Sequence, residues 1–387
     1  MKQFLNPAII ILGTSCASFL AWLLLNDSIS IGYEDKFSIF SWGMYLTVIW
    51  YLLAVIVALI GFKMGVSIKI KTTTFDNVAE MNSDTGYYVF IILASIGVVS
   101  SYIMIVNNIG GLLEIFTNII IAQANNLKFA LYEDYSIGLQ SLRYSSIHVF
   151  TLMVIRRIVF KKKNVIDILP LLLLLSTALV SSRLSIVMSF FQIFLLLILY
   201  NRFNFSKTKL VLTIFTIFNL LSILNISRNY GYYESQELGF YEAGSAEIIN
   251  YLGSPFQGAI SVGENHKLIN QVPERWDLYA GIPLNLTTNS TFLYFYRDYG
   301  WLCFIVSSLL IFSYSLVSGI LIKFKNNFFI LIYTTIMYIF AEFWRVYLFW
   351  EGIIISLIVV PICVYFLLII RRLITDSYAK RNTFNYR

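Results

Sequence analysis

One feature recurs along almost the whole sequence: stretches of about 20 predominantly apolar residues, each long enough to cross the hydrocarbon core of a bilayer as a helix. Hydrophobic residues make up 58% of the 387 positions and charged residues only 13%. Mean hydropathy is positive. A chain of this kind has little polar surface for a separate water-soluble domain. We therefore expect an all-α, polytopic integral membrane protein whose residues 1–387 form a single membrane domain.

About ten such windows are present, which predicts about ten transmembrane helices. The first window shows no small-residue cleavage pattern before its polar end, so it is interpreted as a retained anchor rather than a signal peptide. The windows cover residues 7–25, 38–62, 86–106, 138–160, 165–181, 184–200, 209–226, 300–322, 328–349 and 352–370.

The apolar run 169–200 is unusual because it contains a single charge, Arg183. A helix of 32 residues would reach roughly 48 Å, against a hydrocarbon core of about 30 Å. The run therefore predicts two helices that meet in a turn at 180–185, where serines support a tight turn. Arg183 is then either an anchor that snorkels to the interface or a contact for a ligand.

The basic residues indicate the orientation of the chain. If both termini are cytoplasmic, 19 of the 28 Lys and Arg residues fall in cytoplasmic segments, as the positive-inside rule requires. Most of the net charge of +7 is then explained by the basic residues of the cytoplasmic segments, and binding to nucleic acid is not needed to explain it.

The cysteines and histidines give no sign of a metal or a disulfide framework. Cys16, Cys303 and Cys363 fall in different apolar windows without paired spacing. The two histidines, His148 and His266, are accompanied by no metal-ligand motif. We expect neither a metal nor another cofactor.

Two segments on the expected outer side are longer than ordinary connections. Residues 228–289 lack a hydrophobic window and are rich in Tyr, Gly and Glu, which predicts a large, partly helical outer loop that acts as a lid or binding loop or merely caps the bundle. Residues 107–137 form a moderate outer loop with an approximate helical period. This period predicts an interfacial helix that either gates lipid entry or covers the bundle.

Arginine outnumbers lysine on the expected outer side, whereas lysine dominates inside. A planar guanidinium donates hydrogen bonds in pairs and suits phosphate better than a mobile ammonium, so this set favours an anionic ligand near the outer membrane boundary. Local explanations remain open: an ion pair with Glu342, one turn away, would neutralise Arg345, and Arg143 is interpreted mainly as a helix-end anchor. The outer arginines are Arg143, Arg183, Arg228, Arg275, Arg297 and Arg345.

Aromatic residues cluster in the same outer segments, at "YGYYES", "GFYEAG", "ERWDLYAG" and "FLYFYRDYGW". Most are typical of an interfacial belt. Flat rings beside Glu, Asn, Gln and Arg also suit the binding of sugars, so both interpretations stay open.

Three motifs resemble the O-antigen polymerases, the Wzy-type family that joins lipid-linked oligosaccharide repeat units at the outer face of the bacterial inner membrane. "SSRLS" is similar to the family's arginine in a short turn between spans, and "ISRNYGYYESQELG" places Gly239 after Arg228 in a similar R-x10-G spacing. "NSTFLYFYRDYGW" resembles its entry into a late span. With the number of windows, the long outer loop and the basic cytoplasmic turns, the resemblance covers nearly the whole chain.

The resemblance implies a GT-C-like helical bundle and a metal-independent glycosyltransferase of the bacterial inner (plasma) membrane, with its active site on the outer face. Undecaprenyl-pyrophosphate-linked oligosaccharide would be both donor and acceptor, and a chain-length regulator a further partner. Arginines would hold the pyrophosphate: Arg183 and Arg228 first, then Arg275, Arg297 and Arg345. Asn289 and Tyr296 would bind sugar.

The general base is left open by the sequence. The related O-antigen ligases carry a histidine followed by asparagine where this chain has Thr288 and Asn289, and threonine is not a base at neutral pH. The candidates elsewhere on the outer side are His266, Asp298, Glu342 and Glu264.

Other activities remain as alternatives. A lipid-linked oligosaccharide flippase would need the same cationic groups, but no internal repeat of the kind found in two-halved transporters is evident. An O-antigen ligase would differ in its acceptor and lacks the expected histidine here. A generic transporter would scatter its charges through the membrane rather than place arginines on one side.

Overall fold

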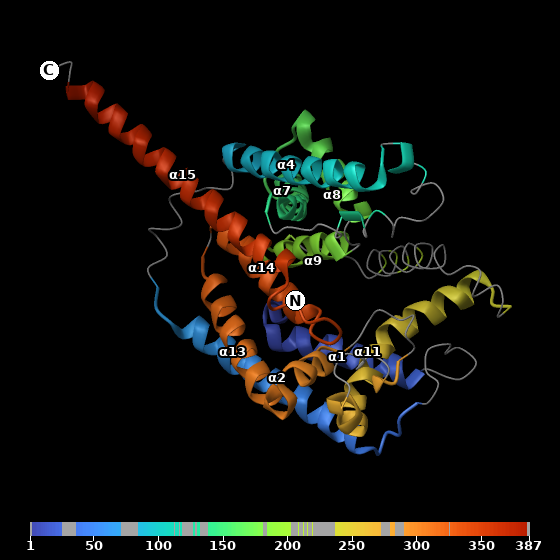
Figure 1. Cartoon of the computed structure of the whole chain (residues 1–387). Coiled ribbons are helices and arrows are strands. Elements are labelled where there is room, and N and C mark those ends of the chain that lie inside the picture. The colour runs from blue at the N-terminus through green and yellow to red at the C-terminus, as the bar shows by residue number, and fades with distance from the viewer. Residues whose placement is uncertain are drawn as a thin grey trace. The chain divides into compact units, whose positions relative to one another are not determined.

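Over the residues that the computed structural model describes, all regular secondary structure is helical, with eleven α-helices and no strand (Figure 1). These residues are 2–24, 36–70, 84–111, 113–115, 117, 127, 130, 131, 138–180, 184–202, 208, 212, 215, 219, 237–271, 279–282, 290–324 and 326–384. The predicted all-α class is thus confirmed for this part of the chain.

The helices follow one another along the chain, with short 3₁₀ helices (η) joining several of them. In order they are η1 Lys2–Leu5, α1 Pro7–Leu24, α2 Trp42–Ser67, α4 Asp84–Ile109, η2 Leu139–Tyr144, α7 Ser145–Ile158, η3 Val165–Ile168, α8 Leu169–Val180, α9 Leu184–Leu199, α11 Phe240–Gln271, α12 Thr291–Tyr299, η5 Gly300–Leu302, α13 Cys303–Leu321, α14 Asn327–Ala341 and α15 Gly352–Phe384.

Five stretches of the described helices are long and apolar enough to cross a membrane, and three further apolar helices are shorter. The chain is therefore a multi-pass membrane protein, as its apolar windows predict. The figure of about ten spans stays a prediction, because the window 209–226 lies largely outside the described residues. The five stretches are Pro7–Leu24, Trp42–Ser67, Asp84–Ile109, Thr291–Leu321 and Gly352–Arg372; the shorter helices are Val165–Val180, Leu184–Leu199 and Phe328–Ala341.

The described chain divides into two compact units. The first unit comprises Met1–Gly65, Asn204–Val317 and Ile339–Phe349, and contains all six of the predicted site residues that are described. The second comprises Val66–Phe203, Ser318–Tyr338 and Trp350–Arg387.

The first unit is built around α11, which packs along α1. Two hydrogen bonds join these helices: the indole N–H of Trp22 donates to Gln257 Oε1 at 2.7 Å, and the Ser18 hydroxyl donates to the Leu252 carbonyl at 2.7 Å. Trp22 and Gln257 are both fully buried. Buried polar groups of this kind fix the register of two apolar helices, because any slip leaves a donor unsatisfied.

Helix α2 crosses α11 where glycines allow the two backbones to touch. A Cβ added to Gly263 would overlap the Cα of Gly43, and one added to Gly43 would overlap the Ile260 carbonyl. Close backbone approach through small residues is a common way for membrane helices to pack. Farther along α2, Trp50 lies between the rings of Phe292 and Phe343, each stacked at 4.7 Å.

The second unit contains a buried polar network between its apolar helices α7, α9, α14 and α15. His148 is fully buried, with Nδ1 3.2 Å from Gln192 Oε1 and Nε2 2.9 Å from the Leu357 carbonyl. Gln192 in turn donates through Nε2 to the Thr335 hydroxyl at 3.1 Å. This network joins α7, α9, α14 and α15, and its side chains are partnered, as buried polar groups must be.

The run 169–200 forms two helices, as its length predicts. Helix α8 ends at Val180 and α9 begins at Leu184. Arg183 itself lies outside the described residues.

The window 328–349 is helical only in its first part, which corrects the expected span. Helix α14 ends at Ala341, and residues 342–349 follow as turns and irregular chain before α15 starts at Gly352. This non-helical segment is nevertheless buried, including Phe343, Trp344, Leu348 and Phe349. Irregular backbone in an apolar setting is tolerated where protein surrounds it.

The two predicted outer loops are described unevenly. Within 228–289, residues Phe240–Gln271 form the single helix α11, and the location of this segment on the outer side stays a prediction. In 107–137, only scattered residues are described, so the predicted interfacial helix lies largely outside the described part.

Candidate functional site

Six of the ten predicted site residues are described, and all six belong to the first unit: His266, Tyr296, Arg297, Asp298, Glu342 and Arg345. The other four lie outside the described residues: Arg183, Arg228, Arg275 and Asn289. The geometry of the candidate site is therefore that of the first six and their neighbours.

His266 lies on α11, near its C-terminal end, and is partly exposed. Its Nδ1 is 3.0 Å from the carbonyl oxygen of Gly263. Because a carbonyl only accepts, Nδ1 carries the proton, and in the neutral ring Nε2 then holds the lone pair. The imidazole is thus oriented by its own helix so that Nε2 is the nitrogen able to accept a proton.

Trp301 of η5 connects His266 with Tyr296. The indole ring is 5.5 Å from the His266 ring and 5.0 Å from the Tyr296 ring, between centroids. Tyr296 is fully buried, whereas Trp301 is 47% exposed. Trp301 therefore has an accessible ring, whereas Tyr296 packs against it from the protein interior.

Asn270 completes this cluster from the same helix as His266. Its side-chain amide donates to the Tyr296 hydroxyl at 2.8 Å. The residues His266, Asn270, Tyr296 and Trp301 are called the histidine–tryptophan cluster below. It combines an imidazole, an amide and an exposed aromatic ring, so polar groups stand beside an apolar face, as in many small-molecule sites.

Arg297 and Asp298 form an ion pair at the end of α12. Arg297 Nε is 2.7 Å from Asp298 Oδ1, and each side chain is about one-third exposed. The guanidinium also lies over the Tyr294 ring, 5.1 Å from its centroid. The Asp298 carboxylate is thus already engaged by Arg297, which favours a structural or ligand-positioning role for Asp298.

Glu342 and Arg345 form a second ion pair, in the irregular segment after α14. Arg345 Nε contacts Glu342 Oε2, and the side chains are only 10% and 8% exposed for Arg345 and Glu342. The guanidinium faces the rings of Tyr251 at 5.0 Å and Trp344 at 5.7 Å. The ion pair that their spacing allows is thus present, next to two aromatic rings.

Glu264, the remaining candidate base, is hydrogen-bonded to the backbone at the start of another helix, α2. Its Oε1 accepts a hydrogen bond from the backbone N–H of Gly43 at 2.7 Å, in the first turn of α2. A carboxylate is favourable at a helix N-terminus, where backbone N–H groups lack partners. Glu264 therefore fixes the α2–α11 crossing.

The structure brings some predicted residues together and separates others. His266 and Tyr296 share one cluster through Trp301, and Arg297 is next to Tyr296 in the chain. The Glu342–Arg345 pair contacts α11 instead at Tyr251, on the other side of Pro255. Tyr251 and His266 are separated by roughly 22 Å of rise along the helix, so these are two distinct places on α11.

The sequence did not predict Asn270 as the partner of Tyr296 or Tyr251 as the partner of Arg345, and it did not indicate Trp301 as a site residue. The one available signal was the spacing of His266 and Asn270, four residues apart and hence on one helix face. Trp301 and Tyr251 depend on contacts between segments distant in the chain, which no local pattern reveals.

Comparison with known proteins gives no counterpart: no family model matches the chain, and neither a curated protein nor a solved structure matches it. Among the described residues, no group of three or more His, Cys, Asp or Glu side chains is placed to hold a metal ion.

Proposed function

We propose that this protein is a glycosyltransferase of the Wzy type, which polymerises undecaprenyl-pyrophosphate-linked oligosaccharide repeat units into a surface polysaccharide. The proposal includes about ten transmembrane helices in a GT-C-like bundle, cytoplasmic termini in a bacterial inner membrane, and an active site on the outer face. It is supported by the multi-pass helical architecture and by the three sequence motifs that resemble this family.

The observation that carries the proposal is the histidine–tryptophan cluster. Nε2 of His266 is set up to accept a proton, beside the exposed ring of Trp301. In the proposed reaction, a hydroxyl oxygen of the acceptor sugar forms a bond to the anomeric carbon of the donor while His266 takes the hydroxyl proton. The bond from that carbon to the pyrophosphate oxygen breaks, and undecaprenyl pyrophosphate leaves with the bonding electrons.

Arginines would offset the charge on the departing pyrophosphate without a metal. Arg183 and Arg228 are assigned first, on the motifs that contain them. Arg297, on α12 directly after Tyr296, is one-third exposed and suited to join them. Arg345 is the least accessible of the described arginines in the set, because it is enclosed with Glu342 and two aromatic rings.

Purified protein reconstituted in vesicles and supplied with undecaprenyl-pyrophosphate-linked repeat units tests the proposal. Polymerisation gives a ladder of products that differ by whole repeat units, with one undecaprenyl pyrophosphate released for each bond formed. A single transfer to a different acceptor would establish a ligase instead, and movement of intact substrate across the bilayer without new bonds would establish a flippase.

A further inference from the structure

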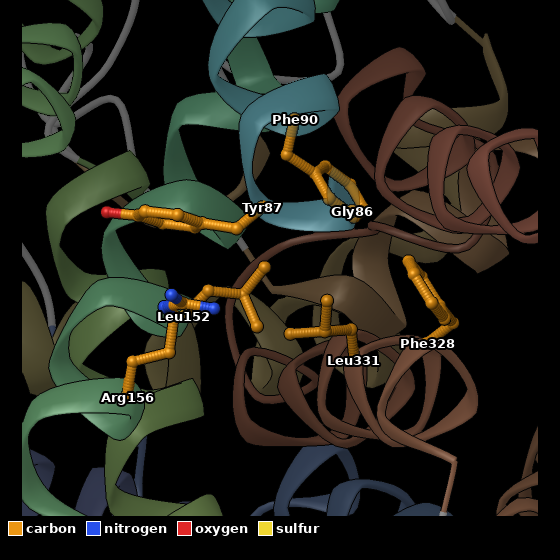
Figure 2. Close-up of a pocket in the computed structure, with 7 residues that line it drawn as sticks. All are labelled: Gly86, Tyr87, Phe90, Leu152, Arg156, Phe328 and Leu331. Atoms are coloured by element: carbon orange, nitrogen blue, oxygen red, sulfur yellow. The ribbon is translucent and has the colours of Figure 1, made fainter. Parts of the chain in front are cut away.

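The interior of the second unit leaves no room for a ligand beside its buried arginine. The space between α4, α7 and α14, shown in Figure 2, is too small to admit more than a water molecule. Arg156 lines this space with its guanidinium over the Tyr87 ring, 4.5 Å from the centroid, and pairs with the Asp84 carboxylate. Any contact with an external anion therefore has to be made at the surface, where the chain leaves α7.

The surface segment that follows α7 is basic, and part of its charge is not neutralised. Lys161, Lys162 and Lys163 follow one another, and Lys161 and Lys163 are exposed. Lys162 Nζ lies 3.9 Å from the Asp84 carboxylate. Among the described residues, no carboxylate lies within ion-pair distance of Lys161 or Lys163. These two charges are available to an external anion.

Lys161 also has an unusual backbone conformation for its residue type. Its φ is 53°, in the left-handed region, where glycine and asparagine are the residue types that fit with the least strain. The turn that ends α9 has Asn201 in the same conformation, at φ 51°. Glycine at position 161 would relieve the strain but remove the charge, so this position separates what the backbone prefers from what the charge contributes.

Hydrogen bonds fix the rest of this segment to α4 and α7. Asn164 and Asp167 form a capping box at η3, and the Asn164 side chain donates to the Tyr88 hydroxyl at 2.6 Å. Asp167 accepts from the Tyr87 hydroxyl at 3.1 Å and from Arg157 Nε at 3.0 Å. The backbone next to the lysines is therefore held in place before any ligand binds, which lowers the entropy cost of binding.

Apolar helices end at this segment. Val165 and Ile168, at the start of the apolar helix that continues through α8, are 95% and 65% exposed. The candidate spans formed by α4 and α15 also have ends here, because Arg371 Nη1 donates to the hydroxyl of Thr85 at 3.2 Å. Exposed apolar side chains beside lysines are typical of the boundary between acyl chains and lipid headgroups.

We propose that residues 161–168, called the basic loop, bind the headgroups of anionic phospholipids at the membrane surface. Lys161 and Lys163 approach the phosphate groups, and Val165 and Ile168 pack against the acyl chains below them. A lipid is favoured over an acidic protein because these apolar side chains continue directly into an apolar helix. Basic residues beside membrane helices attract anionic lipids. This surface is independent of the proposed glycosyl transfer.

Lipid binding by the delipidated, full-length protein tests the proposal, measured by native mass spectrometry. Phosphatidylglycerol is the anionic probe, and phosphatidylcholine with the same acyl chains is the zwitterionic comparison. The wild type should bind phosphatidylglycerol about tenfold more tightly than phosphatidylcholine, the effect of two lysines near a lipid surface.

Three variants assign the surface. The double variant Lys161→Gln, Lys163→Gln should reduce the preference for phosphatidylglycerol to less than about threefold. Lys161→Gly should weaken phosphatidylglycerol binding about fivefold by loss of one charge, while its melting temperature does not fall, because glycine fits the left-handed backbone. Lys267→Gln removes a charge from an exposed lysine of α11 and is the matched control, so it should leave the preference unchanged.

A wild type that binds the two lipids equally would overturn the proposal, and so would a preference that survives in both loop variants. Glycerol 1-phosphate and a polyglutamate peptide are the further probes. If the peptide binds with the expected dependence on Lys161 and phosphatidylglycerol does not, the basic loop is a surface for an acidic protein. If glycerol 1-phosphate does so, the loop takes a free anion. The lipid assignment is wrong in both cases.

Discussion

At the scale of single residues, the candidate site of the first unit consists of two ion pairs and the histidine–tryptophan cluster. The pairing of Glu342 with Arg345, three residues apart, and of Arg297 with its neighbour Asp298 could be anticipated from the sequence. The enclosure of Arg345 by Tyr251 and the meeting of His266 with Trp301 could not, because they depend on how separate helices pack.

His266 is the residue whose replacement tests the proposed chemistry most directly. His266→Ala should lower the rate of polymer formation about 10²-fold or more by removing the general base, with a smaller effect on KM than on kcat. The measurement is the initial rate of ladder formation with purified protein. Lys267→Ala, the exposed neighbour on α11, is the matched control and should retain the wild-type rate. Normal chain lengths and rates in His266→Ala would remove His266 from the mechanism.

Arg183 and Arg228 are predicted to hold the pyrophosphate. Arg183→Ala and Arg228→Ala should accumulate in the membrane like the wild type but leave repeat units unpolymerised, because charge on the leaving group is no longer offset. Product ladders and membrane abundance, measured on the same samples, check this. Full-length polymer from both variants would show that these arginines are not part of the site.

The Glu342–Arg345 pair is predicted to be structural. Glu342→Gln alone should lower the free energy of unfolding by about 3–5 kcal/mol, because Arg345 is left buried with an uncompensated charge. The double variant Glu342→Gln, Arg345→Met should be closer to the wild type, since no charge then remains. Unfolding of the four proteins of this double-mutant cycle in detergent gives the comparison. Additive effects would mean that the two side chains do not interact.

At the scale of helices, apolar length was a good guide to where elements exist and a poor guide to where they end. The run 169–200 is too long for one helix, and it forms α8 and α9. Helix α14, in contrast, ends at Ala341 although the following residues, "EFWRVYLFW", are still rich in apolar side chains. Hydropathy does not distinguish a buried irregular segment from a helix, because both are apolar.

The glycine contact between α2 and α11 can be tested with a matched pair of substitutions. Gly263→Ala should lower the free energy of unfolding by about 1–3 kcal/mol, because the new methyl group would overlap Gly43 and force the helices apart. Gly13→Ala is the control: a Cβ there meets nothing within 4 Å, so alanine should be neutral or slightly stabilising in α1. Thermal unfolding of both variants measures the difference. Equal stability would argue against the close crossing.

At the scale of the whole molecule, the amino-acid composition was sufficient to predict the class of protein. A chain with 58% hydrophobic residues and repeated apolar windows is a multi-pass membrane protein, and the described helices agree. The predicted placement of the arginines around a common ligand is not tested by the structure, because Arg183, Arg228 and Arg275 lie outside the described residues. Their convergence stays a prediction.

The orientation follows from the basic residues and is also testable. A fluorescent protein fused after Arg387 should fold and emit, and alkaline phosphatase at the same position should be inactive, because both termini are predicted to be cytoplasmic. The reverse pattern, with active phosphatase and a dark fluorescent protein, would mean an odd number of spans or an inverted chain.

The early end of α14 has a consequence for biogenesis. A helix of 15 residues rises only about 22 Å, which is less than the thickness of the hydrocarbon core. Such a segment partitions poorly from the translocon into lipid when it emerges alone. We expect it to integrate together with the hydrophobic segment that follows. A cysteine introduced into α14 should therefore react with a water-soluble maleimide in a nascent chain truncated just after Ala341, and it should be protected in one extended through Arg372.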